Sequence, residues 1–235
     1  MTTFKDRLAA IEERIEHACR RAGRRRDEVQ LMAVSKAHPV QAILEAIDAG
    51  VTLFGENRVQ EFERKRPELV HLNQIEVHLL GHLQSNKSAK AAEIFSAVDS
   101  LDSRHLADRL NDAAGKLGRR LPALIELKLS PEETKTGIDP TGPELDSLLD
   151  RLQDLPHLNV RGLMTIPPLD DNPESGRNCF RQLRRVRDEL AMRYPGVDLS
   201  QLSMGMSGDF EIAIEEGSTV VRIGTALFGA REART

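Results

Sequence analysis

Short apolar runs alternate with amphipathic helical patterns along nearly the whole chain, and this alternation limits the possible folds more than any other feature. Eight runs have the length and composition of buried strands. We expect these strands at residues 29–35, 51–54, 76–80, 95–98, 121–127, 160–164, 199–203 and 219–223. Repeated strand–helix units build a parallel sheet. Eight such units in about 200 residues predict a closed (β/α)8 TIM barrel.

A helix precedes the predicted barrel. Thr3 caps this helix with Asp6 three residues later, and apolar residues then recur at spacings of three and four. No linker or repeat interrupts the rest of the sequence. We therefore expect a single domain over residues 1–235, with the N-terminal helix at 1–26 and the barrel at 29–230. The alternative fold is an open flavodoxin-like sheet, because short strands are easily miscounted.

The composition excludes several classes of protein. The chain has 235 residues, of which 40% are hydrophobic and 30% charged, as in an ordinary soluble domain. The net charge of −4 and the 3% aromatic content argue against a nucleic-acid binder. We interpret the basic stretch Arg20–Arg26 as a solvated helix end. No apolar run has the length of a membrane span, and the N-terminus lacks a signal-peptide pattern.

The cysteines and histidines also lack the spacing of a structural or metal site. Cys19 and Cys179 lie far apart, and the seven histidines show no metal-ligand motif. We therefore expect no disulfide, no metal site and a reduced, cytoplasmic protein. No oligomer interface stands out in the sequence, so we expect a monomer.

Lys36 follows the first predicted strand, and the loops after the strands form the active face of such a barrel. It shares the strand's alternation with Met32 and Val34. If these side chains point into the barrel, the lysine lies where water is scarce, and desolvation favours the neutral amine that attacks a carbonyl. The opposite parity would make Lys36 an ordinary surface lysine. The alternation alone does not decide between the two.

Two loops near the C-terminus are suited to bind a phosphate group. Residues 203–209 are rich in glycine and serine and open a short helix, and Gly224 and Thr225 follow the last strand. Glycine loops and helix N-termini present backbone N–H groups to an anion. The loops after strands seven and eight are the common phosphate site of a barrel. The alternative is ordinary turn chemistry, which also favours glycine and serine.

Arg222 shares one face of the last strand with Val220 and Gly224. An arginine inside a barrel is costly unless it is paired. One interpretation is that Arg222 donates a hydrogen bond to the ring nitrogen of pyridoxal 5′-phosphate (PLP), lying between Lys36 and the phosphate loops. The other interpretation is a structural pairing with an acidic residue such as Glu126.

Three further residues have weaker interpretations. Asn57 either orients the phenolic oxygen of a cofactor or caps a helix. His82 is either an acid or base or a packed ring, and we favour packing. Lys135 is either an anion contact or a solvated loop residue, and the sequence does not decide.

Several motifs together resemble the pyridoxal phosphate homeostasis protein family, also called YggS or PROSC. The motifs are AVSK at 33–36, FGENRVQE at 54–61, GHLQSNK at 81–87, RGLM at 161–164, LSMGMS at 202–207 and VRIGTALFG at 221–229. They extend over almost the whole chain. The segment 129–137 departs from the family pattern, although Lys135 and Gly137 are kept.

The resemblance implies a barrel similar to the N-terminal domain of alanine racemase, with PLP held as a Schiff base. The cofactor-binding residues that it implies are Lys36, Asn57, Ser207, Arg222, Gly224 and Thr225. The lysine would carry the Schiff base, the serine, glycine and threonine would contact the phosphate, and the arginine would face the pyridine nitrogen. The asparagine would lie near the ring. The family is thought to carry or buffer PLP, with PLP-dependent apo-enzymes as candidate recipients, and so to influence amino-acid and keto-acid balance.

Two enzymatic alternatives stay open, a PLP-dependent racemase and a lyase that binds a phosphorylated substrate through a lysine Schiff base. Racemisation needs two bases on opposite faces of the substrate Cα. Alanine racemases supply the second as a tyrosine from a further domain, which we expect to be absent because the sequence ends soon after the eighth strand. The only tyrosine, Tyr194, precedes the seventh strand, at the wrong end of the barrel. An arginine at the ring nitrogen also leaves PLP a poorer electron sink. We therefore expect a carrier with no catalytic residue.

Overall fold

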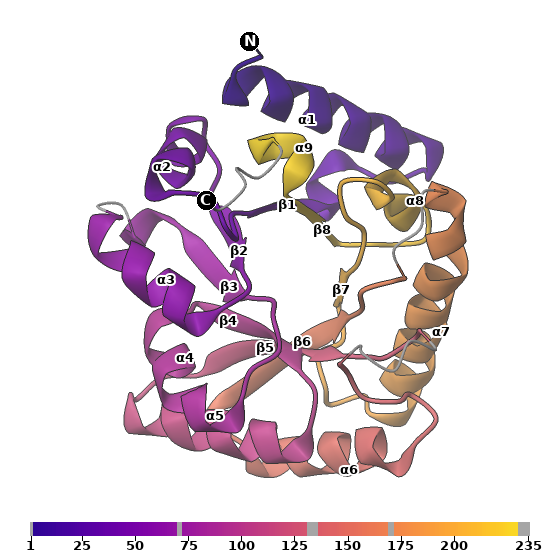
Figure 1. Ribbon diagram of the computed structural model, residues 1–235. Coiled ribbons are helices and arrows are strands. Elements are labelled where there is room, and N and C mark those ends of the chain that lie inside the picture. Colours follow the sequence, from indigo (N-terminus) through magenta and orange to yellow (C-terminus); the bar gives the residue numbers. More distant parts are fainter. Residues whose placement is uncertain (1, 70–71, 131–135, 169–171, 230–235) are drawn as a thin grey trace.

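Eight parallel strands close into a barrel in sequence order (Figure 1). The structure is a computed structural model, which describes residues 2–69, 72–130, 136–168 and 172–229. The strands are β1 (Gln30–Val34), β2 (Leu53–Glu56), β3 (Glu76–Leu79), β4 (Ala97–Leu101), β5 (Leu121–Glu126), β6 (Leu158–Met164), β7 (Gln201–Ser203) and β8 (Val220–Ile223). The predicted (β/α)8 TIM barrel is confirmed, and the open flavodoxin-like alternative is wrong.

Helices alternate with the strands and surround the barrel (Figure 1). They are α2 (Val40–Asp48), α3 (Val59–Lys65), α4 (Ser88–Ile94), α5 (Arg104–Lys116), α6 (Pro143–Arg151), α7 (Arg177–Arg193), α8 (Phe210–Glu215) and α9 (Thr225–Phe228). Short 3-10 turns lie at Arg26–Glu28, Arg66–Glu68, Leu72–Gln74, Ser85–Lys87, Leu152–Asp154 and Pro173–Gly176. Within the described ranges, no helix is long and apolar enough to span a bilayer.

Strands β2 and β4 lie further along the chain than the apolar runs predicted. Each begins two residues later and includes a buried acidic residue, Glu56 in β2 and Asp99 in β4. Glu56 accepts a hydrogen bond from Lys65, and Asp99 is hydrogen-bonded to His78. A partnered charge is tolerated in a buried strand, whereas the sequence pattern alone makes such a residue resemble the start of a loop.

Two separate apolar clusters fix the direction of the β1 side chains. Met32 and Val34 belong to a small cluster with Leu80 and Val220, which come from other strands of the barrel or follow them directly. Ala33, between them, belongs to the larger core that includes the helices. Because side chains alternate along a strand, the even-numbered positions of β1 face the barrel interior.

An additional helix, α1 (Phe4–Arg21), precedes β1 and packs against α8 and α9 (Figure 1). Thr3 and Asp6 form the predicted capping box at its start. Its apolar side faces the protein, since Ile11 and Ile15 are buried.

The basic stretch after α1 attaches this part of the chain to α8 and the segment that follows it. Arg24, whose side chain is 16% exposed, donates hydrogen bonds to the carbonyl oxygens of Ile214 and Ser218. The interpretation of this stretch as a solvated helix end is therefore wrong for Arg24. It agrees better with Arg25, whose side chain is 77% exposed.

We predict that Arg24→Ala lowers the free energy of unfolding by about 1–3 kcal/mol, because it removes charged donors from two backbone carbonyl groups. Arg25→Ala is the matched control, and its effect should stay within about 0.5 kcal/mol. Urea unfolding followed by circular dichroism measures both. Equal losses in the two variants would show that the Arg24 contacts contribute nothing specific.

Candidate ligand-binding site

A cavity of about 630 Å³ opens at the carboxyl ends of the barrel strands. All of the residues that the sequence indicated for cofactor binding line it: Lys36, Asn57, Ser207, Arg222, Gly224 and Thr225. His82 lines the same cavity, whereas Lys135 lies outside the described residues. Segments far apart in the sequence thus meet at one concave surface, which is the usual form of a small-molecule site.

Lys36 lies two residues beyond the end of β1 and lines the cavity. Met32 and Val34, which precede it on the same face, pack inside the barrel. The parity that makes Lys36 an inward-facing residue is therefore confirmed, and the surface-lysine alternative is wrong.

Arg222 is 5% exposed and is held by neutral acceptors in the barrel wall. It donates to the hydroxyl of Ser203 at 2.7 Å and to the carbonyl oxygen of Thr165 at 2.8 Å. Burial lowers the pKa of Arg222, and the carboxylates of Asp99 and Asp209 oppose this shift. Among the described residues, then, the direct hydrogen-bond partners of Arg222 are uncharged, and the proposed pairing with an acidic residue is not made.

Glu126 ends β5 inside the barrel, lines the cavity and is 4% exposed. Its Oε1 accepts a hydrogen bond from the Thr136 hydroxyl at 3.0 Å. Its buried Oε2 has no hydrogen-bond partner among the described residues. Burial raises the pKa of Glu126, while the Thr136 hydrogen bond acts in the opposite direction. A buried oxygen without a partner is costly, so this position favours a ligand or a water molecule that supplies a donor.

The loops after β7 and β8 meet at the cavity wall. Gly205 has φ +92°, and a Cβ there would lie 2.5 Å from the Cβ of Ala213, so the turn requires glycine. The Ser207 hydroxyl accepts a hydrogen bond from the Ala226 N–H at 3.4 Å, which joins the two loops. Gly224 and Thr225 begin α9, where the first N–H groups have no acceptor within the helix.

Asn57 lies against the loop after β3. A Cβ added to Gly81 would lie 2.1 Å from the backbone oxygen of Asn57, so the close approach of these two loops requires glycine. In the described structure Asn57 follows β2 directly and precedes α3 by two residues. Its side chain lies at the cavity rather than serving as a helix cap, because the N-cap position of α3 is Arg58.

His82 lies at the cavity and is not a packed ring, so the packing interpretation is wrong. Its side chain is 51% exposed, and Nδ1 lies 2.7 Å from Oδ2 of Asp102. Asp102 directly follows β4, at the carboxyl end of the barrel. The apolar run 95–98 ends three residues before β4 does, so it gives no indication of this pairing. A correctly placed β4 would have put both side chains on the same rim.

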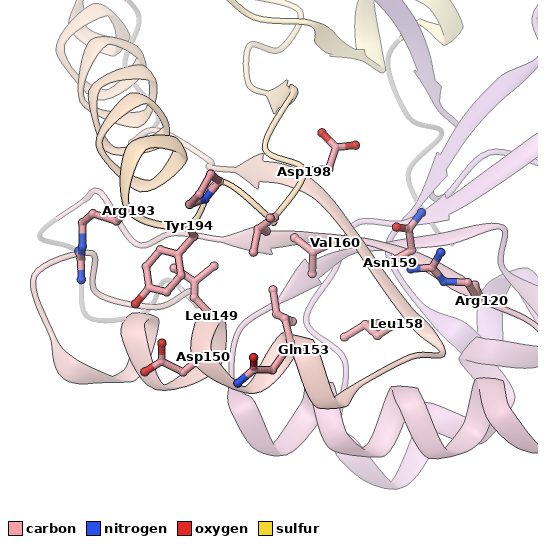
Figure 2. A pocket seen from close by; sticks show the side chains of 14 residues that line it. Arg120, Leu149, Asp150, Gln153, Leu158, Asn159, Val160, Arg193, Tyr194 and Asp198 are labelled. Carbon is pink, nitrogen blue, oxygen red and sulfur yellow. The ribbon is translucent and has the colours of Figure 1, made fainter.

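Tyr194 lines a separate hollow of about 460 Å³, together with Leu158 at the start of β6 and Asp198 before β7 (Figure 2). Because these residues precede or begin the strands, the hollow lies at the end of the barrel opposite the cavity that Lys36 lines. Its hydroxyl is 3.4 Å from Oδ1 of Asp146. The predicted position of the only tyrosine, away from the cavity that holds Lys36, is confirmed.

The cavity combines groups suited to one type of ligand. It offers a lysine amine for a carbonyl, a buried guanidinium for a ring acceptor, and hydroxyl and glycine N–H groups for an anion. In the part of the chain that the structure describes, no group of three or more histidine, cysteine, aspartate or glutamate side chains is arranged to hold a metal ion.

Comparisons with known proteins agree with this geometry. The family model described as "Alanine racemase, N-terminal domain" matches residues 7–232. The pyridoxal phosphate homeostasis protein of Aquifex aeolicus is 46% identical over 227 residues, which cover 97% of this chain and 98% of that protein. The pyridoxal phosphate homeostasis protein of Escherichia coli K12 is 43% identical over 234 residues, covering 99% of this chain and 98% of that protein.

Solved structures of other proteins are also similar to this chain. PipY of Synechococcus elongatus with PLP bound has a TM-score of 0.86 and 42% identity, covering 97% of this chain and all of that chain. An alanine racemase of Clostridium difficile has a TM-score of 0.74 at 16% identity, covering 97% of this chain and 58% of that chain, and it shows the fold alone. The chain therefore belongs to the alanine racemase N-terminal domain family and, within it, to the pyridoxal phosphate homeostasis proteins.

Proposed function

We propose that this protein binds PLP in the cavity at the carboxyl ends of the strands and takes part in PLP homeostasis by holding and releasing it. The observation that carries the proposal is the convergence of Lys36 and Arg222 with the two phosphate-type loops on one cavity. Two findings on relatives support the proposal. Similar proteins are named pyridoxal phosphate homeostasis proteins, and the similar protein PipY has a structure with PLP bound.

Each candidate residue has a defined role in this proposal. The amine of Lys36 would hold PLP through its aldehyde as a Schiff base, with one water released on attachment and taken up again on hydrolysis. Ser207, Gly224 and Thr225 contact the phosphate. Arg222 donates to the ring nitrogen, and Asn57 lies near the ring.

The polar groups of the cavity fit such a ligand. The guanidinium of Arg222 carries more N–H donors than its two hydrogen bonds use, so it can also serve an acceptor in the cavity. The unpartnered Oε2 of Glu126 favours a donor from the ligand or from accompanying water. The cavity of about 630 Å³ lies within the usual size range of small-molecule sites.

A carrier suits the cavity better than a racemase. Racemisation needs a second base on the face opposite the lysine, and Tyr194 lies at the other end of the barrel. An arginine at the ring nitrogen donates a hydrogen bond without protonating the ring, which weakens PLP as an electron sink. We therefore propose that the protein has no catalytic residue and transfers PLP to PLP-dependent apo-enzymes. A single domain over residues 1–235, a monomeric state and a cytoplasmic location stay predictions.

We predict that the purified protein gains a near-visible absorption band on incubation with PLP and that Lys36→Ala abolishes the band. Borohydride reduction followed by peptide mass analysis should place the PLP adduct on Lys36 alone. Lys116→Ala, which removes an exposed lysine at the end of α5, is the control and should keep both signals. A wild-type protein that stays colourless would refute the proposed PLP binding and would leave the lyase interpretation.

A second prediction concerns the phosphate loops. The wild type should bind PLP about a hundredfold or more tightly than pyridoxal, because charge-assisted hydrogen bonds to phosphate are strong. The double variant Ser207→Ala/Thr225→Ala should lose about tenfold or more of its PLP affinity. Its pyridoxal affinity should stay the same, so pyridoxal is the control ligand. Titration followed by absorbance measures both, and equal losses for the two ligands would argue against phosphate contacts.

A third prediction is that the PLP-loaded protein does not sustain racemisation of alanine. The physical reason is that the lysine has no tyrosine partner across the cavity. Chiral chromatography of the product over many turnover times measures this, with an authentic alanine racemase assayed in parallel. Racemisation that scales with protein concentration and disappears in Lys36→Ala would contradict the carrier proposal.

A further inference from the structure

Lys65, at the end of α3, is buried next to the segment that carries Lys36. It is 8% exposed, and its Nζ lies 2.7 Å from Oε1 of Glu56, 2.8 Å from Oε1 of Glu61 and 3.0 Å from the carbonyl oxygen of Ser35. Each N–H of the ammonium group therefore has an acceptor. Neither Lys65 nor the two glutamates line the cavity as far as the structure describes it.

This network contacts the backbone on both sides of Lys36. On one side Lys65 donates to the Ser35 carbonyl oxygen, and the Ser35 hydroxyl donates to Oε1 of Glu56 at 2.8 Å. On the other side the Ala37 N–H donates to Oε1 of Glu61 at 2.6 Å. The peptide groups before and after Lys36 are thus both attached to buried or half-buried charges of β2 and α3.

The backbone at this point needs such support. Ala37 has φ +63°, in the left-handed region that residues with a side chain rarely occupy. The His38 N–H donates to the Ser35 carbonyl oxygen at 3.1 Å, which closes a tight turn around Lys36. A strained backbone conformation persists only where its surroundings hold it, and such strain is concentrated at functional sites.

Burying these charged side chains is energetically costly. The network is therefore better explained by fixing the position of the backbone than by adding stability. Glu56 is fully buried, burial raises its pKa, and its Oε2 has no hydrogen-bond partner among the described residues. Buried ion pairs commonly contribute little net stability, whereas removal of one partner leaves an uncompensated charge. Their best-attested use is to fix a single arrangement of the chain.

We propose that Glu56, Glu61 and Lys65 form a positioning clamp that fixes the turn around Lys36 and so directs its amine into the cavity. None of the three is among the described residues that line the cavity. Lys65 and Glu61 act through the backbone next to Lys36, and Glu56 acts through Lys65 and the Ser35 hydroxyl. The consequence for the ligand rests on the proposed function, because it assumes that Lys36 forms the Schiff base. The consequence for the backbone does not depend on PLP.

A surface site on the neighbouring helix provides a matched control. Lys90 of α4 also lies between two glutamates, with Nζ 3.3 Å from Oε1 of Glu63 and 2.8 Å from Oε2 of Glu93, but its side chain is 39% exposed. Lys90→Met therefore removes the same kind of bridge without affecting the turn around Lys36.

The first test is hydrogen exchange of the Ala37 N–H in the protein without PLP, compared among wild type, Glu61→Ala, Lys65→Met and Lys90→Met. We expect exchange to be about tenfold faster or more in the two clamp variants, because hydrogen bonds to charged groups are among the strongest in proteins. Lys90→Met should exchange as the wild type does. Unchanged exchange in both clamp variants would overturn the clamp. Far-UV circular dichroism checks folding, and Glu61→Met, which has a similar length and no oxygen acceptor for the Ala37 N–H, replaces any variant that fails to fold.

The second test measures the fraction of bound PLP that is attached to Lys36. Bound PLP is quantified by its phosphate, and the attached part by borohydride trapping and mass analysis. In the clamp variants we expect the attached fraction to fall at least about twofold while the phosphate loops still retain PLP. A merely structural role would lower total binding and leave this fraction unchanged. If the wild type itself attaches no PLP, the proposed function fails, but the exchange measurement still decides whether the clamp exists.

Discussion

Pairing between the first and last strands is the interaction on which the site depends. β1 pairs with β8 in parallel, with Met32 opposite Arg222 and Ala33 opposite Ile223. This pairing closes the barrel and places the end of β1, with Lys36, beside the start of α9, with Gly224 and Thr225. Neither the lysine nor the phosphate-type loop makes a binding site alone. Barrel closure joins them, so the stability of the fold and the formation of the site have the same physical origin.

Apolar and polar side chains lie next to one another inside the barrel. Met32 and Val34 pack together with Val220, whereas Arg222, which is paired with Met32 in the β1–β8 register, and Asp99 are buried polar residues. Burial alone lowers the pKa of His78, but the carboxylates of Asp99, at 3.1 Å, and of Glu76 outweigh burial and raise the pKa to about 9. The protonated form of His78 is therefore favoured at neutral pH. The negative charge of Asp99 also favours the charged form of Arg222 across the interior.

Sequence patterns predicted the parts of this structure that depend on periodicity and local turn chemistry. The barrel and the capping box of α1 follow from the spacing of apolar residues and from short-range rules, whereas the alternation along β1 left the direction of Lys36 open. The sequence patterns did not indicate which side chains pair with the buried charges, because these partners are polar and distant in the sequence. Lys65 lies in a polar segment of the sequence, where only its i, i+4 spacing from Glu61 indicates a partner. The pairing of His82 with Asp102 does not follow from the apolar run 95–98, because β4 continues to Leu101 and brings Asp102 to the rim of the barrel.

Three of the six residues proposed to contact PLP are held by neighbours that are not proposed to contact it. Ser203 and Thr165 hold Arg222, Ala226 bonds to the Ser207 hydroxyl, and the buried charges of β2 and α3 hold the turn around Lys36. Such support lowers the entropy that binding must overcome, since the groups are already ordered before the ligand arrives. This arrangement agrees with the proposed function, in which the groups that hold PLP are in place before it binds and water reverses the single covalent bond when PLP leaves.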